Sequence, residues 1–288
     1  MSATTTAQGQ WQPHLPATAL IGQQLAQYQA PALQQLVADH NVLGQLERKI
    51  WQGEAPATLP SSNHEAEWVR LPAQLPQLSQ PGLLLMDMDS TAIQIECIDE
   101  IARRGGCYQQ VAAVTEQAMQ GQLDFVTALR QRVSLLRGIP ATVLTDIAAE
   151  LPLMPGLIRL CQQLHQQGWV IAIASGGFNA IASVLAAQLQ LDYFEANDLE
   201  QIDGLLSGEL LGGIVDAERK AQILVELGAR YRIPAQQWVA VGDGANDLPM
   251  LAAAQLGVGF HAKPAVAKQA DVAINQLGLD AILALLRP

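Results

Sequence analysis

Short apolar runs alternate with amphipathic stretches from residue 81 to the C-terminus. The run Leu83–Met86 follows Pro81-Gly82 and is uninterrupted, as is typical of a strand buried on both faces of a parallel sheet. Helical spacing and further apolar runs predict helices near 156–167, 178–190, 217–230 and 246–255, and strands near 169–174, 238–242 and 256–260. Residues 205–211, with turn residues at their centre, predict an appended hairpin. The alternation predicts an α/β fold with a doubly wound parallel sheet.

One long interval interrupts this alternation, because nothing strand-like lies between Asp89 and Trp169. Glycines at 105–106, 121 and 138 divide residues 97–151 into groups with helical spacing. The groups are Ile98, Ile101 and Ala102; Val111, Val114 and Ala118; and Phe125, Leu129, Val133 and Leu136. We therefore expect a small helical domain, 97–151, inserted into a core made of 81–96 and 152–288.

Residues 1–80 form a third region, rich in glutamine, alanine and proline. Between Pro31 and Trp51, six apolar positions lie at near-helical spacing: Leu33, Leu36, Val37, Leu43, Leu46 and Ile50. Five prolines follow between residues 56 and 81, as in a linker. We expect a partly helical segment with a proline-rich linker, and no βαββαβ amino-acid-sensing module. Its role is not indicated by the sequence.

Composition narrows the class of protein. Of 288 residues, 50% are hydrophobic and 15% charged, and the formal charge is −11, which disfavours binding to nucleic acid or anionic membranes. Three widely spaced cysteines and five histidines without ligand spacing argue against disulfides or a zinc site. The N-terminus has no signal-peptide features, and no apolar run is long enough to span a bilayer. We expect a cytoplasmic protein.

Acidic residues follow two of the predicted strands. Asp87 and Asp89 come directly after Met86, and Asp243, Asn246 and Asp247 follow the strand near 238–242. At an effective dielectric constant of about 20, two carboxylates about 4 Å apart repel each other by about 4 kcal/mol, so such a pair favours a cation or a proton. One such cluster could be a polar turn. Two clusters in one chain indicate divalent-metal and phosphate chemistry.

Two further elements are weaker when taken alone. Ser175-Gly176-Gly177 ends the predicted strand near 169–174, where backbone N–H groups could approach an anion, although this tripeptide is also a common turn. Lys220 lies in the predicted helix 217–230, where a lone lysine is most often solvated.

In this order and with these spacers, the four elements resemble the motifs of the haloacid dehalogenase (HAD) superfamily of phosphotransferases. The segment from Leu84 to Lys268 is similar to the bacterial phosphoserine phosphatase family. The resemblance rests on Asp87-Met-Asp-Ser-Thr-Ala-Ile-Gln-Ile-Glu96, Arg132-Val-Ser-Leu-Leu, Ala-Ser175-Gly-Gly-Phe and Val-Gly-Asp243-Gly-Ala-Asn-Asp-Leu-Pro-Met. It implies a HAD-like, Rossmann-type core, with residues 97–151 as a cap over the substrate.

The resemblance also implies roles for the core residues. Asp87 would be the nucleophile that forms an aspartyl-phosphate, and Asp89 the general acid and base. Mg²⁺ would be held by Asp87, the backbone carbonyl of Asp89, and Asp243. The phosphoryl oxygens would be bound by Ser175, the Gly176 N–H, Lys220 and Asn246. Asp247 would position Lys220 or a metal-bound water, and capping of the following helix is an open alternative.

In the cap, the resemblance implies that Glu96 binds the substrate ammonium and Arg132 its carboxylate, whereas each alone would be read as a surface charge. Phe125 would pack over the substrate, or belong to the cap core. The function so implied is Mg²⁺-dependent hydrolysis of the small molecule O-phospho-L-serine to L-serine and phosphate, the last step of L-serine biosynthesis. A HAD enzyme for phosphohomoserine or a sugar phosphate is an alternative, although Glu96 and Arg132 argue against sugars. A non-catalytic phosphoamino-acid sensor is the other, and the retained nucleophile argues against it.

Overall fold

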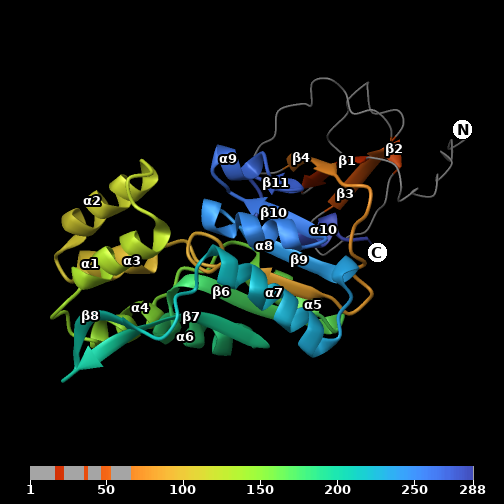
Figure 1. The fold of residues 1–288 in the computed structure, drawn as a ribbon. Helices are drawn as coiled ribbons and strands as arrows, with labels where there is room; N and C mark the ends of the chain where they lie inside the picture. The colour runs from red at the N-terminus through yellow and green to blue at the C-terminus, as the bar shows by residue number, and fades with distance from the viewer. Residues whose placement is uncertain (1–16, 23–35, 38–46, 53–65, 288) are drawn as a thin grey trace, which may run out of the picture.

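The computed structural model describes residues 17–22, 36–37, 47–52 and 66–287. Its larger sheet has seven strands in the order β11-β10-β9-β5-β6-β7-β8. They are β5 (Leu83–Met86), β6 (Val170–Phe178), β7 (Tyr193–Ile202), β8 (Leu205–Leu211), β9 (Trp238–Gly242), β10 (Leu256–Phe260) and β11 (Val272–Ile274). Only the β7–β8 pair is antiparallel, and the other neighbours are parallel. The predicted α/β sheet is confirmed (Figure 1).

Strand β5 lies in the centre of the sheet and is buried along its whole length. Leu84 and Met86 pack into the core on one face, and Leu83 and Leu85 into the core on the other. The first face is covered by α5 (Leu157–Gln166), α6 (Asn179–Leu189) and α10 (Ala281–Leu285). The second is covered by α7 (Ala217–Tyr231), α8 (Leu248–Ala253) and α9 (Pro264–Ala267). Burial on both faces explains why β5 is an unbroken apolar run.

Four helices are inserted after β5, where the sequence analysis expects a helical insertion with three groups of helical spacing. They are α1 (Cys97–Arg104), α2 (Tyr108–Met119), α3 (Phe125–Ser134) and α4 (Thr142–Ala149), and we call them the cap. The two linkers to the core pair with each other, since Gln94 N donates to Pro152 O and Met154 N to Ala92 O, at 2.8 and 2.9 Å. The cap lies at one end of the molecule (Figure 1).

The predicted hairpin exists, but its turn lies elsewhere than the sequence analysis placed it. Residues 205–211 form the single strand β8, and the chain reverses at Asp203-Gly204, where both residues have positive φ (52° and 78°). This is the backbone that a two-residue type I′ hairpin requires, and Asp-Gly is a favoured pair for it. The glycine within β8, Gly208, also has a positive φ of 83°, but the strand continues through it without a turn.

The N-terminal region differs most from expectation. Antiparallel strands β1 (Ala17–Gly22), β2 (Leu36–Val37), β3 (Glu47–Gln52) and β4 (Ala66–Leu71) form a sheet in the order β2-β3-β1-β4. The helix predicted over 31–51 is therefore wrong where it is described, because β3 pairs on both edges and this long-range pairing outweighs local spacing. The strand order is that of a βαββαβ arrangement, contrary to the expectation from sequence. The intervening segments, 23–35 and 53–65, lie outside the described residues.

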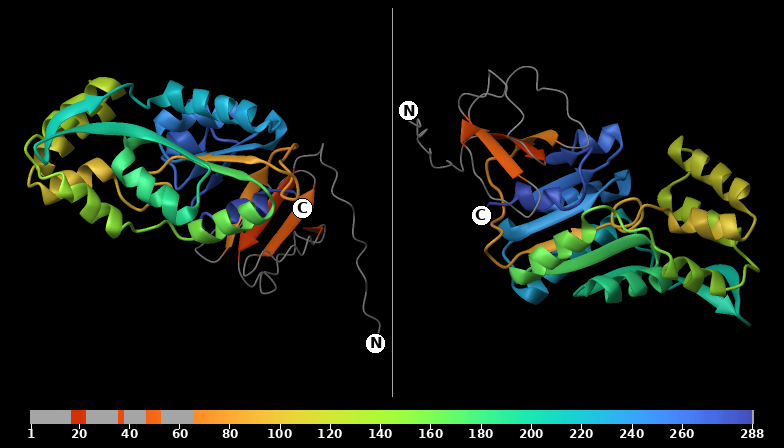
Figure 2. Two further views of the ribbon diagram at one scale, coloured as in Figure 1. Left: turned by 90° about the horizontal axis from the view of Figure 1, so that it is seen from below. Right: turned by 180° about the vertical axis from the view of Figure 1, so that it is seen from behind.

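Two buried charged side chains join this sheet to the core. Arg48 donates through Nη1 to Ala284 O and Leu286 O, both at 2.7 Å. The Glu67 carboxylate accepts from Asn275 N, Gln276 N and Leu277 N at 2.7–3.4 Å. The N-terminal sheet and the cap consequently lie at opposite ends of the molecule (Figure 2). In the described part of the chain, no helix combines the length and apolar character needed to cross a membrane.

Candidate active site

Asp87 is the first residue after β5 and is almost completely buried. Its backbone N–H donates to Val241 O at 2.9 Å, which joins it to β9. One carboxylate oxygen, Oδ1, accepts from Met88 N at 2.7 Å and lies 2.8 Å from Lys220 Nζ. The other oxygen, Oδ2, has no hydrogen-bond donor among the described residues. Burial, with the nearby Asp247 charge, raises the pKa of Asp87 well above its usual range, although Lys220 opposes this.

Lys220 is not the solvated lysine that its helical position alone would suggest. Its side chain is fully buried, and Nζ lies 2.8 Å from Asp87 Oδ1 and 2.7 Å from Asp247 Oδ1. Asp216 is the N-cap of helix α7, and its side chain accepts from Arg219 N at 2.9 Å. Burial lowers the pKa of Lys220, but the Asp247 and Asp87 carboxylates outweigh it and the net shift is upward. The lysine therefore remains a cation between two acids.

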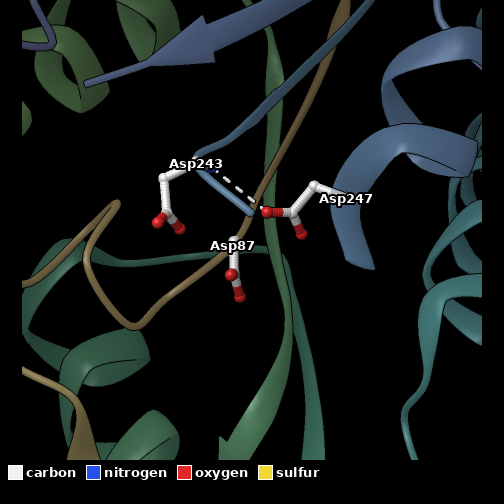
Figure 3. A group of neighbouring side chains, drawn as sticks. All are labelled: Asp87, Asp243 and Asp247. Carbon is white, nitrogen blue, oxygen red and sulfur yellow. Dashed lines mark hydrogen bonds between the residues drawn. The ribbon is translucent and has the colours of Figure 1, made fainter. Parts of the chain in front are cut away.

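Asp87, Asp243 and Asp247 form a group that could hold a metal ion. One carboxylate oxygen from each lies within 4.8 Å of the others (Figure 3). Asp247 is already fully engaged, since Oδ1 accepts from Lys220 Nζ and Oδ2 accepts from Asp243 N and Gly244 N at 3.1 and 3.0 Å. Asp247 occupies the N-cap position of α8, but its side chain makes no capping bond to that helix, so it does not stabilise α8 in this way. Burial, with Asp247 and Glu96 nearby, raises the pKa of Asp243 to about 6.

Asp89 has a different environment from Asp87. Its carboxylate accepts from Cys97 N (Oδ2, 3.0 Å) and from Cys97 Sγ (Oδ1, 2.9 Å), at the start of α1. Burial raises the pKa of Asp89 to about 7, and the Glu96 charge adds to the effect. Near neutral pH this carboxyl group can therefore both release and take up a proton, as a general acid and base must. Nothing in the sequence pattern indicates that Cys97 is its partner.

The Ser175-Gly176-Gly177 loop is held by a residue that the sequence analysis missed. Asn197, in β7 and buried, donates through Nδ2 to Gly176 O at 2.8 Å and Gly177 O at 3.3 Å. Its Oδ1 accepts from Val215 N at 2.9 Å, in the segment leading to α7. The fully buried Ser175 Oγ accepts from Gly177 N at 2.9 Å. The sequence held no clear signal for this role, because Asn197 lies among other polar residues of β7 and only the fold buries it.

Gly177 lies close to the side chains of Met88 and Asp89. A Cβ there would lie 2.8 Å from Met88 Cε and 3.3 Å from Asp89 Oδ1, so the loop approaches Asp89 closely. Asn246 is half-buried, with its amide oxygen against Gly244, and it makes no hydrogen bond to Asp87 or Asp243. Thr91, also missed from the sequence, is fully buried and donates through Oγ1 to Asp243 Oδ1 at 3.4 Å.

Glu96, Arg132 and Phe125 are the remaining residues for which the resemblance implies a role. Glu96 is exposed, and Oε1 accepts from Ser90 Oγ at 2.7 Å. Arg132 is half-buried, and its side chain makes one weak bond, Nε to Ala128 O at 3.4 Å, with no carboxylate within 4.0 Å in the described part of the chain. Burial lowers the pKa of Arg132, while Glu96, Asp99 and Asp89 pull it upward. A Cβ on Gly176 would lie 3.0 Å from Phe125 Cζ, so Phe125 lies directly against the loop.

Comparisons with known proteins agree with this arrangement. Residues 82–255 match the family model of the haloacid dehalogenase-like hydrolases. The chain is 50% identical over 222 residues to the phosphoserine phosphatase of Vibrio cholerae serotype O1, covering 77% of this chain and 67% of that protein. It also resembles the crystal structure of a probable phosphoserine phosphatase from Vibrio cholerae, with a TM-score of 0.76 and 39% identity over 96% of this chain and 88% of that one.

A third relative was solved as a substrate-bound phosphoserine phosphatase complex. It is 36% identical, with a TM-score of 0.68, and the alignment covers 72% of this chain and 99% of that one. The buried Asp87–Lys220–Asp247 group, the acidic strand ends and the helical cap are thus found in a chain whose sequence and fold both match these enzymes. The chain belongs to the haloacid dehalogenase-like hydrolases, and to the family of its phosphoserine phosphatase relatives.

Proposed function

We propose that this protein hydrolyses O-phospho-L-serine to L-serine and phosphate, with Mg²⁺ as cofactor. The observation that carries the proposal is the environment of Asp87, whose Oδ1 is fixed by Lys220 and Met88 while Oδ2 is left without a donor among the described residues. Oδ2 is then the atom that attacks phosphorus, and an aspartyl-phosphate forms as the serine oxygen leaves. Phosphate monoesters hydrolyse very slowly without catalysis, so the site must supply on the order of 20 kcal/mol of barrier reduction.

The site residues fit a magnesium ion. Asp87 and Asp243 would supply carboxylate oxygens, which Mg²⁺ prefers. The family resemblance adds the Asp89 backbone carbonyl as a third ligand. We assign Asp247 to positioning, because both of its oxygens already accept bonds from Lys220 and the backbone. When bound, the ion would neutralise charge on the phosphoryl oxygens and on Asp87.

The leaving group requires a proton, and Asp89 is the candidate donor. With a pKa of about 7, a substantial fraction of Asp89 carries a proton at neutral pH and can deliver it to the serine oxygen. The resulting carboxylate can then take a proton from the water that hydrolyses the aspartyl-phosphate. Lys220, the Ser175 hydroxyl, the Gly176 N–H and Asn246 would bind the phosphoryl oxygens as charge spreads over them.

Substrate selectivity is assigned to the cap. Arg132 has no carboxylate partner within 4.0 Å in the described part of the chain, so it is available to the substrate carboxylate, and exposed Glu96 to the ammonium. Phe125 would cover the bound amino acid from the cap side of the Ser175 loop. No nucleic-acid or membrane partner is needed for this activity, and we place the protein in the cytoplasm.

A panel of phosphorylated small molecules, assayed for phosphate release with and without Mg²⁺, tests the proposal. L-Phosphoserine should be the preferred substrate, ahead of phosphohomoserine and sugar phosphates, and EDTA should abolish turnover. Glu96→Gln and Arg132→Ala should each reduce kcat/KM for L-phosphoserine about tenfold or more, and leave p-nitrophenyl phosphate nearly unchanged, because that ester has neither an ammonium nor a carboxylate. Equal losses on both substrates would refute the assignment of these two residues.

A further inference from the structure

The cap is joined to the core at a second place, far along the chain from its linkers. After α3, the loop 138–141 pairs with the β7–β8 hairpin. Gly138 N donates to Leu206 O at 2.8 Å, Leu206 N to Ile139 O at 2.9 Å, and Ala141 N to Gly204 O at 2.8 Å. These backbone bonds extend the sheet beyond β8 into the cap. The hairpin therefore moves with the cap or holds it in place.

The hairpin also packs tightly against the end of α3 at Gly208. A Cβ on this residue would lie 3.1 Å from Arg137 Cβ, 3.1 Å from Ser134 O and 3.3 Å from Ser134 Cα. Ser134 is the last residue of α3. The φ of Gly208 is 83°, in the left-handed region that side chains disfavour. Both the available space and the backbone conformation thus select glycine where β8 meets the end of α3.

Helix α3 connects this contact to the active site. At its first residue, Phe125 lies against Gly176 of the Ser175 loop. At its last residue it abuts Gly208, about 15 Å away for a helix of ten residues. Arg132 lies within the last turn of α3, at the end of the helix that contacts the hairpin. Its own side-chain bond, to Ala128 O at 3.4 Å, is too weak to fix the guanidinium, so its position depends on where the helix lies.

We propose that the β7–β8 hairpin is a brace for α3, and that Gly208 is a positioning residue that sets the location of Arg132 and hence the selectivity for a substrate carboxylate. The inference rests on the proposed function, because it assigns Arg132 to that carboxylate. Gly208 touches no substrate and acts only through the helix. A side chain at this position would push the end of α3 away from β8 while leaving the phosphate-binding core in place.

The test compares two glycine variants of the full chain. Gly208→Ala should raise KM for L-phosphoserine about tenfold, the loss expected for a misplaced charged hydrogen bond, and change kcat/KM for p-nitrophenyl phosphate less than twofold. Gly212→Ala is the matched control, since Gly212 also has a positive φ, 71°, but a Cβ there would meet no described atom within 4 Å. This variant should leave KM and kcat/KM unchanged for both substrates. The comparison therefore distinguishes the effect of backbone strain from the effect of the contact with α3.

A double variant identifies the route of the effect. In the Arg132→Ala background, Gly208→Ala should cause no further loss on L-phosphoserine, because the group it displaces is gone. Additive losses, or equal losses on both substrates, would overturn the proposal. If Gly208→Ala does not fold, Gly208→Asn tolerates the positive φ better while presenting a Cβ to the same atoms. A wild-type enzyme that shows no preference for L-phosphoserine would instead refute the proposed function.

Discussion

Replacing Lys220 by methionine removes the only side-chain cation that contacts Asp87 and Asp247 among the described residues, while preserving much of the side-chain length. Each contact, at 2.7–2.8 Å, corresponds to about 6 kcal/mol of gross attraction at an effective dielectric constant of about 20. Most of that is offset by the cost of burying the charges, and breaking a buried pair costs about 3–5 kcal/mol net. We expect Lys220→Met to lower Tm by roughly 10 °C in EDTA.

The loss should depend on pH in a definite direction. The pKa of Asp87 is already raised by burial and by Asp247, and Lys220 is one of the groups that lower it. Without the lysine the folded-state pKa rises further above the unfolded value. The variant is therefore closest to the wild type at pH values where Asp87 is protonated, and it loses stability as the pH rises towards the higher folded-state pKa. Thermal unfolding followed by circular dichroism at pH 5 and pH 8 measures this difference.

Activity supplies an independent measure of the same substitution. Turnover of L-phosphoserine and of p-nitrophenyl phosphate should fall by similar factors, because both esters present the same phosphoryl group to the core. Lys268→Met, at an exposed position, is the control and should match the wild type in both assays. The reasoning is refuted if Lys220→Met keeps its Tm within about 2 °C in EDTA, or if its destabilisation is larger at pH 5 than at pH 8.

Three further substitutions test separate parts of the structure. Asp87→Asn should abolish turnover with an unchanged circular dichroism spectrum, because the amide is nearly isosteric but far less nucleophilic, and measurable kcat in protein free of wild type would contradict it. Asn197→Leu removes the side-chain bonds to two glycine carbonyls and to the Val215 N–H, at a cost of about 1–3 kcal/mol each. It should lower kcat about tenfold or more on both substrates. A loss on L-phosphoserine alone would argue against a role of Asn197 in holding the loop. Glu67→Gln weakens the bonds to residues 275–277 and should lower the free energy of unfolding by about 2 kcal/mol while leaving kcat/KM unchanged. Loss of activity at an unchanged Tm would refute this structural role of Glu67.

The sequence was informative wherever local pattern and chemistry coincide. An unbroken apolar run followed by Asp87 and Asp89 predicts a central parallel strand with a polar carboxyl end, and β5 confirms the strand. The three groups of helical spacing over 97–151 coincide with α1, α2 and α3, because each of these helices shows its period within its own residues, whereas α4 was not predicted. The metal-capable acids were found for the same reason, since each follows a recognisable strand.

Tertiary structure decided what depends on partners distant in sequence. Strand β3 is held by pairing with β1 and β2, so its helical spacing was misleading. Lys220 differs from a surface lysine only because α7 places it between Asp87 and Asp247, which are 133 and 27 residues away in the chain. Asn197 is important because β7 places it beside the Ser175 loop. Gly208 would pass for an ordinary turn glycine without the end of α3 packed against it. The spacing of residues in the sequence predicts local periodicity and the ends of strands. Burial and ion pairing depend on contacts that exist only in the folded chain.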